Sequence, residues 1–183
     1  MINEELTYRV LRNFGFVPTD DQRNAIEVFA RFMTDRNERS VMLLRGSAGT
    51  GKTSLAAAIV RTMQELKQRV SLLAPTGRAA KVFSLNAGQP AATIHRAIYR
   101  EKAFTGLDGK FNLNVNLFRD RLFMVDEASM ISLSAGNTTF GSGCLLDDLI
   151  QYVYNGRNCR LLLVGDKAQL PPVGEEESPA LRA

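Results

Sequence analysis

The residues best suited to chemistry form a glycine-rich run, GSAGTGKT, between Gly46 and Thr53. The run matches the pattern G-x-x-x-x-G-K-[ST], in which backbone N–H groups of a tight loop converge on phosphate oxygens. An apolar stretch at 41–44 precedes it and a helical pattern follows, so the loop leads into a helix N-terminus that attracts anions. The alternative is a structural glycine-rich turn before a helix.

We therefore expect Mg²⁺-ATP to bind here. Lys52 would reach the β- and γ-phosphates, and the Thr53 hydroxyl would ligate Mg²⁺. The residues expected to line the phosphates are Gly46, Ser47, Ala48, Gly49, Thr50, Gly51, Lys52 and Thr53.

A pair of acids, Asp126 and Glu127, follows another apolar stretch at 122–125. Ligands of open parallel sheets bind at the carboxyl ends of the strands, where one carboxylate can hold Mg²⁺. The adjacent carboxylate can polarise the attacking water as a general base. We assign the metal role to Asp126 and the base role to Glu127, the alternative being an acidic turn that ends a strand.

The run VGDKAQLPPVG, from Val164 to Gly174, leaves a fourth apolar stretch in the same way. A glutamine at the end of a strand, here Gln169, can donate a hydrogen bond to a γ-phosphate. A strand followed by a Pro-Pro loop is also a plain structural stop.

The rest of the chain reads as alternating strands and helices. Four apolar runs without polar alternation are typical of strands buried on both faces, and they are 41–44, 70–73, 122–125 and 161–164. Amphipathic patterns predict helices at 3–14, 20–33, 53–66, 77–85, 94–100 and 145–153. Their alternation indicates an α/β fold, a parallel sheet with helices on both faces.

The buried face of the second helix should carry Ile26, Phe29, Ala30 and Met33. Thr19 and Gln22 have the spacing of a capping box at its start.

Two segments interrupt this rhythm. Apolar residues alternate with asparagines from Phe111 to Leu117, which predicts a half-exposed strand, and Asp108-Gly109 just before it signals a hairpin turn. The run 134–143 is small, polar and glycine-rich, so it reads as a surface loop.

The charge of the 183-residue chain is uneven. The net charge is +4, but the segment from Arg69 to Arg121 alone carries +6, which leaves −2 elsewhere. A local basic excess suits a polyanion, although a solvated surface would explain it equally.

Other classes of protein are excluded by composition. The two cysteines, Cys144 and Cys159, have no metal-site spacing, so we expect inert thiols and neither zinc nor a disulfide. No apolar run could span a membrane, and the N-terminus does not resemble a signal peptide, so we expect a cytoplasmic protein.

Five motifs together resemble superfamily-one DNA helicases, in the branch of the exonuclease V alpha subunit (RecD-like) and the phage Dda helicase. They are GSAGTGKT, LLAPTGRAAK, ATIHR, VDEASM and VGDKAQLPPVG, and their order and spacing agree from Thr19 to Gly174.

The resemblance implies a RecA-like P-loop NTPase domain acting 5′ to 3′ on single-stranded DNA. It implies that Gln22 contacts adenine, a role compatible with capping, and that Gln169 senses the γ-phosphate. The motif residues Pro75, Thr76 and Arg78 would touch DNA.

Thr93 and His95 would belong to a second phosphate-contacting motif, although a lone histidine is as often used for packing or capping. The hairpin would be the small insertion, at about 101–118, that separates the duplex, or else an ordinary surface hairpin. The family's sheet predicts that the four apolar strands lie in the order 2-3-4-1, with 41–44 at an edge.

The resemblance also implies a second RecA-like domain, with arginines that complete the ATP site. We expect that domain to be missing from this chain, which would then be a first motor domain that binds nucleotide without unwinding DNA. Two alternatives stay open, another P-loop ATPase acting on RNA and a nucleotide-dependent binding module without turnover. Partner exonuclease subunits are left unspecified.

Overall fold

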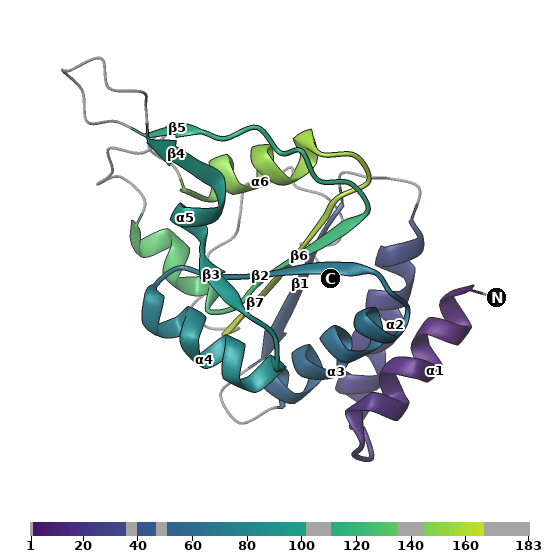
Figure 1. Ribbon diagram of the computed structural model, residues 1–183. Coiled ribbons are helices and arrows are strands. Elements are labelled where there is room, and N and C mark those ends of the chain that lie inside the picture. The colour runs from purple at the N-terminus through teal and green to yellow at the C-terminus, as the bar shows by residue number, and fades with distance from the viewer. Residues whose placement is uncertain (1, 36–39, 47–50, 102–110, 135–144, 167–183) are drawn as a thin grey trace.

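The structure is a computed structural model that describes residues 2–35, 40–46, 51–101, 111–134 and 145–166. Its centre is a five-stranded sheet whose strands all run parallel (Figure 1). The strand order is β1-β7-β6-β2-β3. The strands are β1 (Val41–Gly46), β2 (Arg69–Ala74), β3 (Ala91–Thr93), β6 (Arg121–Val125) and β7 (Arg160–Asp166).

The predicted order of the four apolar strands is therefore confirmed. β2, β6, β7 and β1 are consecutive neighbours, and β1 lies at the edge of the described sheet. The short β3, which the sequence pattern did not reveal, extends the opposite edge beyond β2.

Helices cover both faces of the sheet, as the alternating elements predicted (Figure 1). One core packs side chains of α1 to α4 against the sheet, and the other packs α5, α6 and the 3₁₀ turn η1 against it. Along β6, Leu122 and Met124 enter the first core, whereas Phe123 and Val125 enter the second. The helical elements are α1 (Ile2–Phe14), α2 (Asp20–Thr34), α3 (Lys52–Glu65), α4 (Gly77–Ala87), α5 (Ile94–Ile98), η1 (Ala128–Ser134) and α6 (Leu145–Asn155).

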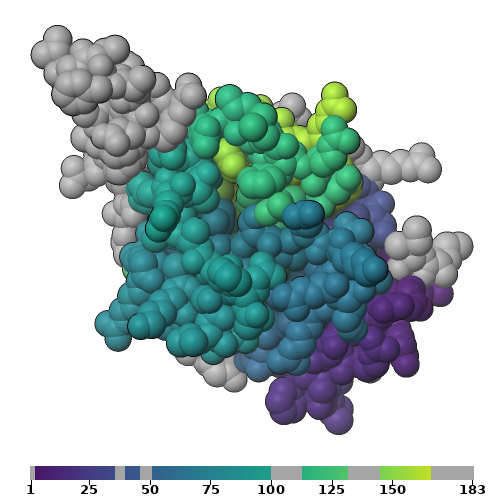
Figure 2. All heavy atoms as spheres, viewed as in Figure 1, coloured from purple at the N-terminus to yellow at the C-terminus, as the bar shows by residue number. Residues whose placement is uncertain are grey.

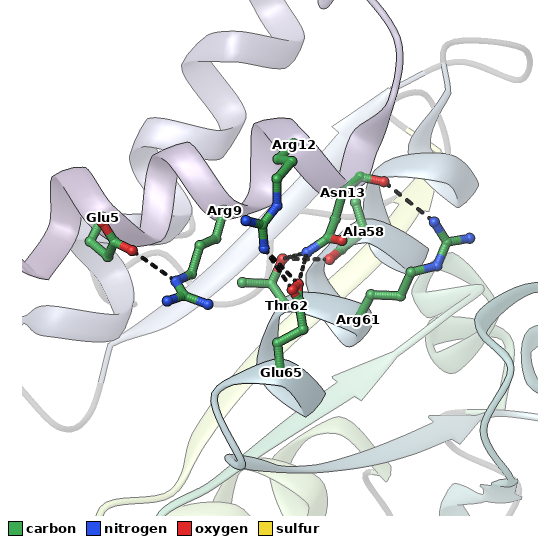
Figure 3. A network of polar contacts seen from close by, with 8 residues as sticks. All are labelled: Glu5, Arg9, Arg12, Asn13, Ala58, Arg61, Thr62 and Glu65. Atoms are coloured by element: carbon green, nitrogen blue, oxygen red, sulfur yellow. Dashed lines mark hydrogen bonds and ion pairs between the residues drawn. The ribbon is translucent and has the colours of Figure 1, made fainter.

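A polar network fastens α1 to α3 (Figure 3). The Asn13 amide donates to Thr62 Oγ1 at 3.0 Å and to Glu65 Oε1 at 2.7 Å, and Arg12 pairs with Glu65 at 2.9 Å. The Asn13 hydrogen bond is the main reason why the pKa of Glu65 is lowered, and Arg12 adds to it. The N-terminal residues thus form one flank with α3, the helix that follows the glycine-rich loop (Figure 2).

The buried face of α2 differs from the prediction at one position. Ile26, Phe29 and Ala30 are buried as expected, but Phe32 takes the place predicted for Met33, which is only half-buried. Phe32 joins the first hydrophobic core, and the Arg160 guanidinium lies 5.8 Å from the centre of its ring and donates to its carbonyl at 3.0 Å.

The helix predicted at 94–100 is shorter than expected. α5 ends at Ile98, because Tyr99 begins β4 (Tyr99–Glu101), which pairs antiparallel with β5 (Phe111–Leu113). These two strands form a separate sheet beside α5 and α6 (Figure 1). Their pairing is that of a hairpin, although the turn predicted at Asp108-Gly109 lies outside the described residues.

The strand predicted to run to Leu117 stops at Leu113, and the alternation beyond it is wrong. Val115 and Leu117 are 62% and 87% exposed, whereas Asn116 is only 5% exposed. The Asn116 amide turns inward because it donates to the carbonyls of Tyr152 and Val153, at 3.0 and 3.1 Å, in the last turn of α6. Carbonyls at the end of a helix supplied the acceptors that the sequence pattern did not show.

Gly156, just after α6, has no room for a side chain. A Cβ placed there would lie 2.5 Å from Asn116 Nδ2 and 2.7 Å from Cys159 Sγ. We predict that Gly156→Ala lowers the free energy of unfolding by about 1–3 kcal/mol, the usual cost of overpacking a core. Urea denaturation measures this, with Gly77→Ala as the control, since nothing lies within 4 Å of a Cβ at Gly77. Equal stability of the two variants would show that the Asn116 contact does not constrain the fold.

Candidate nucleotide site

The carboxyl ends of the parallel strands gather the predicted chemical residues at one edge of the sheet. Gly46 ends β1, Asp126 follows β6, and Pro75 follows β2. The parallel register places these ends side by side. Ser47, Ala48, Gly49, Thr50 and Gln169 lie outside the described residues.

Lys52 and Thr53 lie in the first turn of α3, directly after the glycine-rich loop. Gly51, the residue before the helix, has φ +81°, a left-handed conformation that favours glycine. The N-terminus of α3 presents N–H groups and a positive dipole toward this edge. Lys52, Thr53 and the start of α3 therefore lie together at the edge where we expect phosphate and Mg²⁺ to bind.

Gln22 lies beside this turn and caps α2 as expected, while its contact with adenine stays a prediction. Its backbone N–H donates to Thr19 Oγ1 at 3.1 Å, and its Oε1 accepts from the Thr19 N–H at 2.9 Å. Its amide nitrogen would be 2.8 Å from a Cβ at Gly51. The capping box thus fixes the side chain with its nitrogen against the loop that would hold phosphates.

The charge of Lys52 acts on the carboxylate of Asp126 in this arrangement. Its N–H donates to the Leu73 carbonyl at 3.0 Å, which continues the ladder between β2 and β6. Burial raises the pKa of Asp126, and both the Glu127 N–H, at 2.9 Å from Asp126 Oδ1, and the Lys52 ammonium partly oppose that rise. The lysine and the carboxylate therefore share one electrostatic environment.

Glu127 is exposed and has a left-handed backbone, with φ +53°. Such a conformation costs a non-glycine residue roughly 1–2 kcal/mol. Strained backbone of this kind occurs often at functional sites. It turns the chain out of β6 at the point where a water-activating carboxylate is expected.

Mg²⁺ fits the donors present. Mg²⁺ in phosphate sites takes one or two protein oxygens and completes its shell with phosphate and water. The Asp126 carboxylate and the Thr53 hydroxyl are such donors, and no group of three or more histidine, cysteine or acidic residues in the described part of the chain forms a metal cage. The site thus suits a metal that arrives with its nucleotide.

The residues expected to touch DNA follow β2 and β3 on the same edge. Pro75 is buried, which leaves Thr76 and Arg78 as the exposed side chains of that motif, and Thr76 also caps α4 by accepting from the Ala79 N–H at 3.1 Å. Thr93 caps α5, where its hydroxyl accepts from the Arg96 N–H at 3.2 Å.

His95 packs against a buried pair that the sequence did not reveal. Its ring centre lies 5.7 Å from that of Tyr99, whose hydroxyl donates to the buried Asp148 of α6 at 2.5 Å. Burial lowers the pKa of His95, which favours the neutral ring at physiological pH. Tyr99 and Asp148 are 49 residues apart and belong to no motif, so no local signal could have joined them.

A cavity of about 630 Å³ lies away from this edge, at the opposite ends of the strands. Apolar side chains of α1, α2 and α3 line it, among them Leu6, Met33 and Met63, together with Arg160 at the start of β7. It takes no part in the candidate site.

The sheet order and the strand-end residues define a RecA-like P-loop ATPase domain. A family model described as an AAA domain matches residues 31–175, and the chain belongs to this family.

The chain is also a distant homologue of helicases of superfamily one. It is 31% identical over 157 residues to the ATP-dependent RecD2 DNA helicase of Deinococcus radiodurans, which covers 86% of this chain and 20% of that protein. It is 26% identical over 165 residues to the ATP-dependent DNA helicase dda of Enterobacteria phage T4, covering 88% and 34%. The chain therefore spans about a fifth of the length of RecD2 and about a third of that of the phage protein.

Among solved structures, the Pif1 helicase from Candida albicans is similar over 91% of this chain and 38% of its own, at 21% identity and a TM-score of 0.47. No helix in the described ranges is both long and apolar enough to cross a membrane.

Proposed function

We propose that this chain is the first motor domain of a DNA helicase, which binds and hydrolyses Mg²⁺-ATP to drive movement along single-stranded DNA. The main support for the proposal is the arrangement at the carboxyl edge of the sheet. There the charge of Lys52 acts on Asp126, and the amide nitrogen of Gln22 lies next to Gly51. The direction of movement, 5′ to 3′, is inferred from the resemblance of the motifs alone.

Each residue has a distinct part in the proposed reaction. Gln22 would hold the adenine, and Lys52 would bind the β- and γ-phosphates at the N-terminus of α3. Thr53 and Asp126 would hold Mg²⁺, which neutralises charge that develops on the phosphates. Glu127 would accept the proton of the attacking water. Gln169 would contact the γ-phosphate and signal its loss.

DNA would bind at the same edge, over α4 and α5. Because Thr76 and Arg78 follow β2 and Thr93 ends β3, a single strand crossing these ends would lie next to the nucleotide. Adjacency of this kind would allow a change at the γ-phosphate to reach the DNA contacts. The sheet of β4 and β5, which follows α5 in the chain, would contact the duplex at the point where its two strands separate.

We predict weak, salt-sensitive binding of single-stranded DNA, because one domain offers few phosphate contacts. Arg78→Ala should lower the affinity for all sequences alike and reduce the slope of log affinity against log salt by about 1. Fluorescence polarisation with a labelled oligonucleotide measures both quantities, and an RNA of the same sequence tests the choice of nucleic acid. An unchanged affinity at low salt would remove Arg78 from the DNA path, and clearly tighter RNA binding would favour an RNA-acting ATPase.

A further inference from the structure

The basic segment identified in the sequence divides between two opposite edges of the sheet. Arg78 and Arg96 follow the carboxyl ends of β2 and β3, on the side of the nucleotide site. Arg69 and Arg121, in contrast, are the first residues of β2 and β6. The turns that enter β2, β6 and β7 lie together on the right of Figure 1, away from the nucleotide site.

Arginines at this second edge stand next to one another in pairs. Arg69 and Arg121 are direct partners in the register of β2 and β6, and Arg119 and Arg157 are partners in an isolated bridge beside β6 and β7. Lys67, in the turn before β2, adds a further exposed cation. Like charges directly opposite each other on neighbouring strands destabilise a sheet.

No acid in the described part of the chain forms an ion pair with these cations. Lys67, Arg69, Arg119 and Arg157 are exposed and form no ion pair with any described residue. The acid that lies between them, Asp120, accepts a hydrogen bond from the Asn158 amide at 2.8 Å.

Arg121 is held in place but incompletely satisfied. Its guanidinium lies 3.8 Å from the centre of the Phe118 ring and donates to Ser71 Oγ at 2.8 Å, while its Nε is buried without a partner. Burial, and secondarily the charge of Arg69, lowers the pKa of Arg121. The edge therefore carries repulsion between like charges, which an external anion would relieve.

We propose that this edge, the strand-start cluster of Lys67, Arg69, Arg119, Arg121 and Arg157, binds the phosphate backbone of double-stranded DNA. Guanidinium groups match phosphate oxygens in geometry as well as charge. Neighbouring strands are about 4.8 Å apart, so the cluster extends over about 10 Å across β7, β6 and β2. A duplex offers a phosphate charge every ~1.7 Å of its axis, enough to neutralise the cluster as a whole.

Two features favour a duplex over a single strand. Proteins that bind single strands without sequence preference stack bases on aromatic side chains, but at this edge the Arg121 guanidinium already stacks on the Phe118 ring, 3.8 Å from its centre. The strand-start cluster also lies at the opposite edge of the sheet from the motif residues Thr76 and Arg78. A single strand bound to Thr76 and Arg78 would therefore not reach the cluster. The choice of DNA as the polyanion rests on the proposed function.

The test is a double variant, Arg119→Gln with Arg157→Gln, compared with a control that removes the same charge elsewhere, Arg31→Gln with Arg61→Gln. Fluorescence polarisation without nucleotide, using a labelled blunt duplex and one of its strands, gives the affinities over a range of salt. We expect the first variant to lose about tenfold in duplex affinity at low salt, and its salt slope to fall by about 2. Its single-strand affinity should stay close to that of the wild type.

The melting temperature supplies a second readout. Removing Arg119 and Arg157 relieves repulsion, so the variant should melt at the same temperature or higher, which also shows that it is folded. Unchanged duplex binding, or an equal loss in the control, would overturn the proposal. Stronger displacement of the duplex by polyglutamate than by unlabelled DNA would overturn it in favour of an acidic protein partner. Failure of ATP binding would instead count against the proposed function alone.

Discussion

Glu127→Gln is expected to lower the rate of ATP hydrolysis by about 10²–10⁴, the usual contribution of a general base. The affinity for ATP should remain near that of the wild type, because the phosphates and the metal are assigned to Lys52, Thr53 and Asp126. The amide keeps the shape of the side chain and the left-handed turn at this position, so the fold should be preserved.

Single-turnover hydrolysis, with protein in excess over labelled ATP, measures the chemical step even when it is slow. Calorimetry on the same variant measures binding separately. A hydrolysis rate close to that of the wild type would place the base on another residue. A joint loss of binding and hydrolysis would mean that Glu127 supports the phosphate loop instead.

A second prediction concerns the rate of ATP hydrolysis by these 183 residues tested on their own. We expect them to bind ATP but to hydrolyse it very slowly and to unwind nothing, since translocation needs two RecA-like domains that close on the nucleotide. An arginine finger contributed by another domain is worth about 10³–10⁵ in kcat, which corresponds to roughly 4–7 kcal/mol of barrier. The factor of about 10²–10⁴ in rate expected of Glu127 does not exceed the range given for the arginine finger, so Glu127 cannot replace the arginine.

The comparison uses the 183-residue chain and a form extended by a second RecA-like domain, in assays of DNA-stimulated ATPase and fork unwinding. Size-exclusion chromatography establishes that the shorter chain is a monomer, because the apolar edge strand β1 offers a route to self-association. Strong DNA-stimulated turnover by the monomer would contradict the assignment as half of a motor.

The place of the candidate nucleotide site in the fold could be predicted because its determinants are local in the sequence. The glycine-rich run fixes a turn and a helix start by itself, and Asp126 is placed by the end of an apolar strand. The sheet order followed from the family's pattern and is confirmed, and the Thr19–Gln22 capping box, a three-residue motif, is present as expected.

What the sequence could not reveal depends on partners distant in the chain. Asn116 was expected to face solvent, but the end of α6, 36 residues away, binds its amide. Tyr99 left its predicted helix to pair with Leu113. The basic segment looked like one surface, but successive βα units carried its arginines to opposite edges of the sheet. The periodicity of a sequence indicates which residues are apolar, but it does not indicate which distant group a polar side chain will bind.

The measurement that tests the central claim most directly is calorimetric titration of Mg²⁺-ATP into the wild type, Lys52→Ala and Lys67→Ala. Lys67 is an exposed lysine at the opposite edge and matches the change of charge. Charged hydrogen bonds contribute about 1.5–3 kcal/mol each, so Lys52→Ala should weaken ATP binding by at least about tenfold. We expect Lys67→Ala to bind ATP with the affinity of the wild type. Equal affinities for ATP in the wild type and Lys52→Ala would contradict the assignment of this chain as a P-loop motor domain.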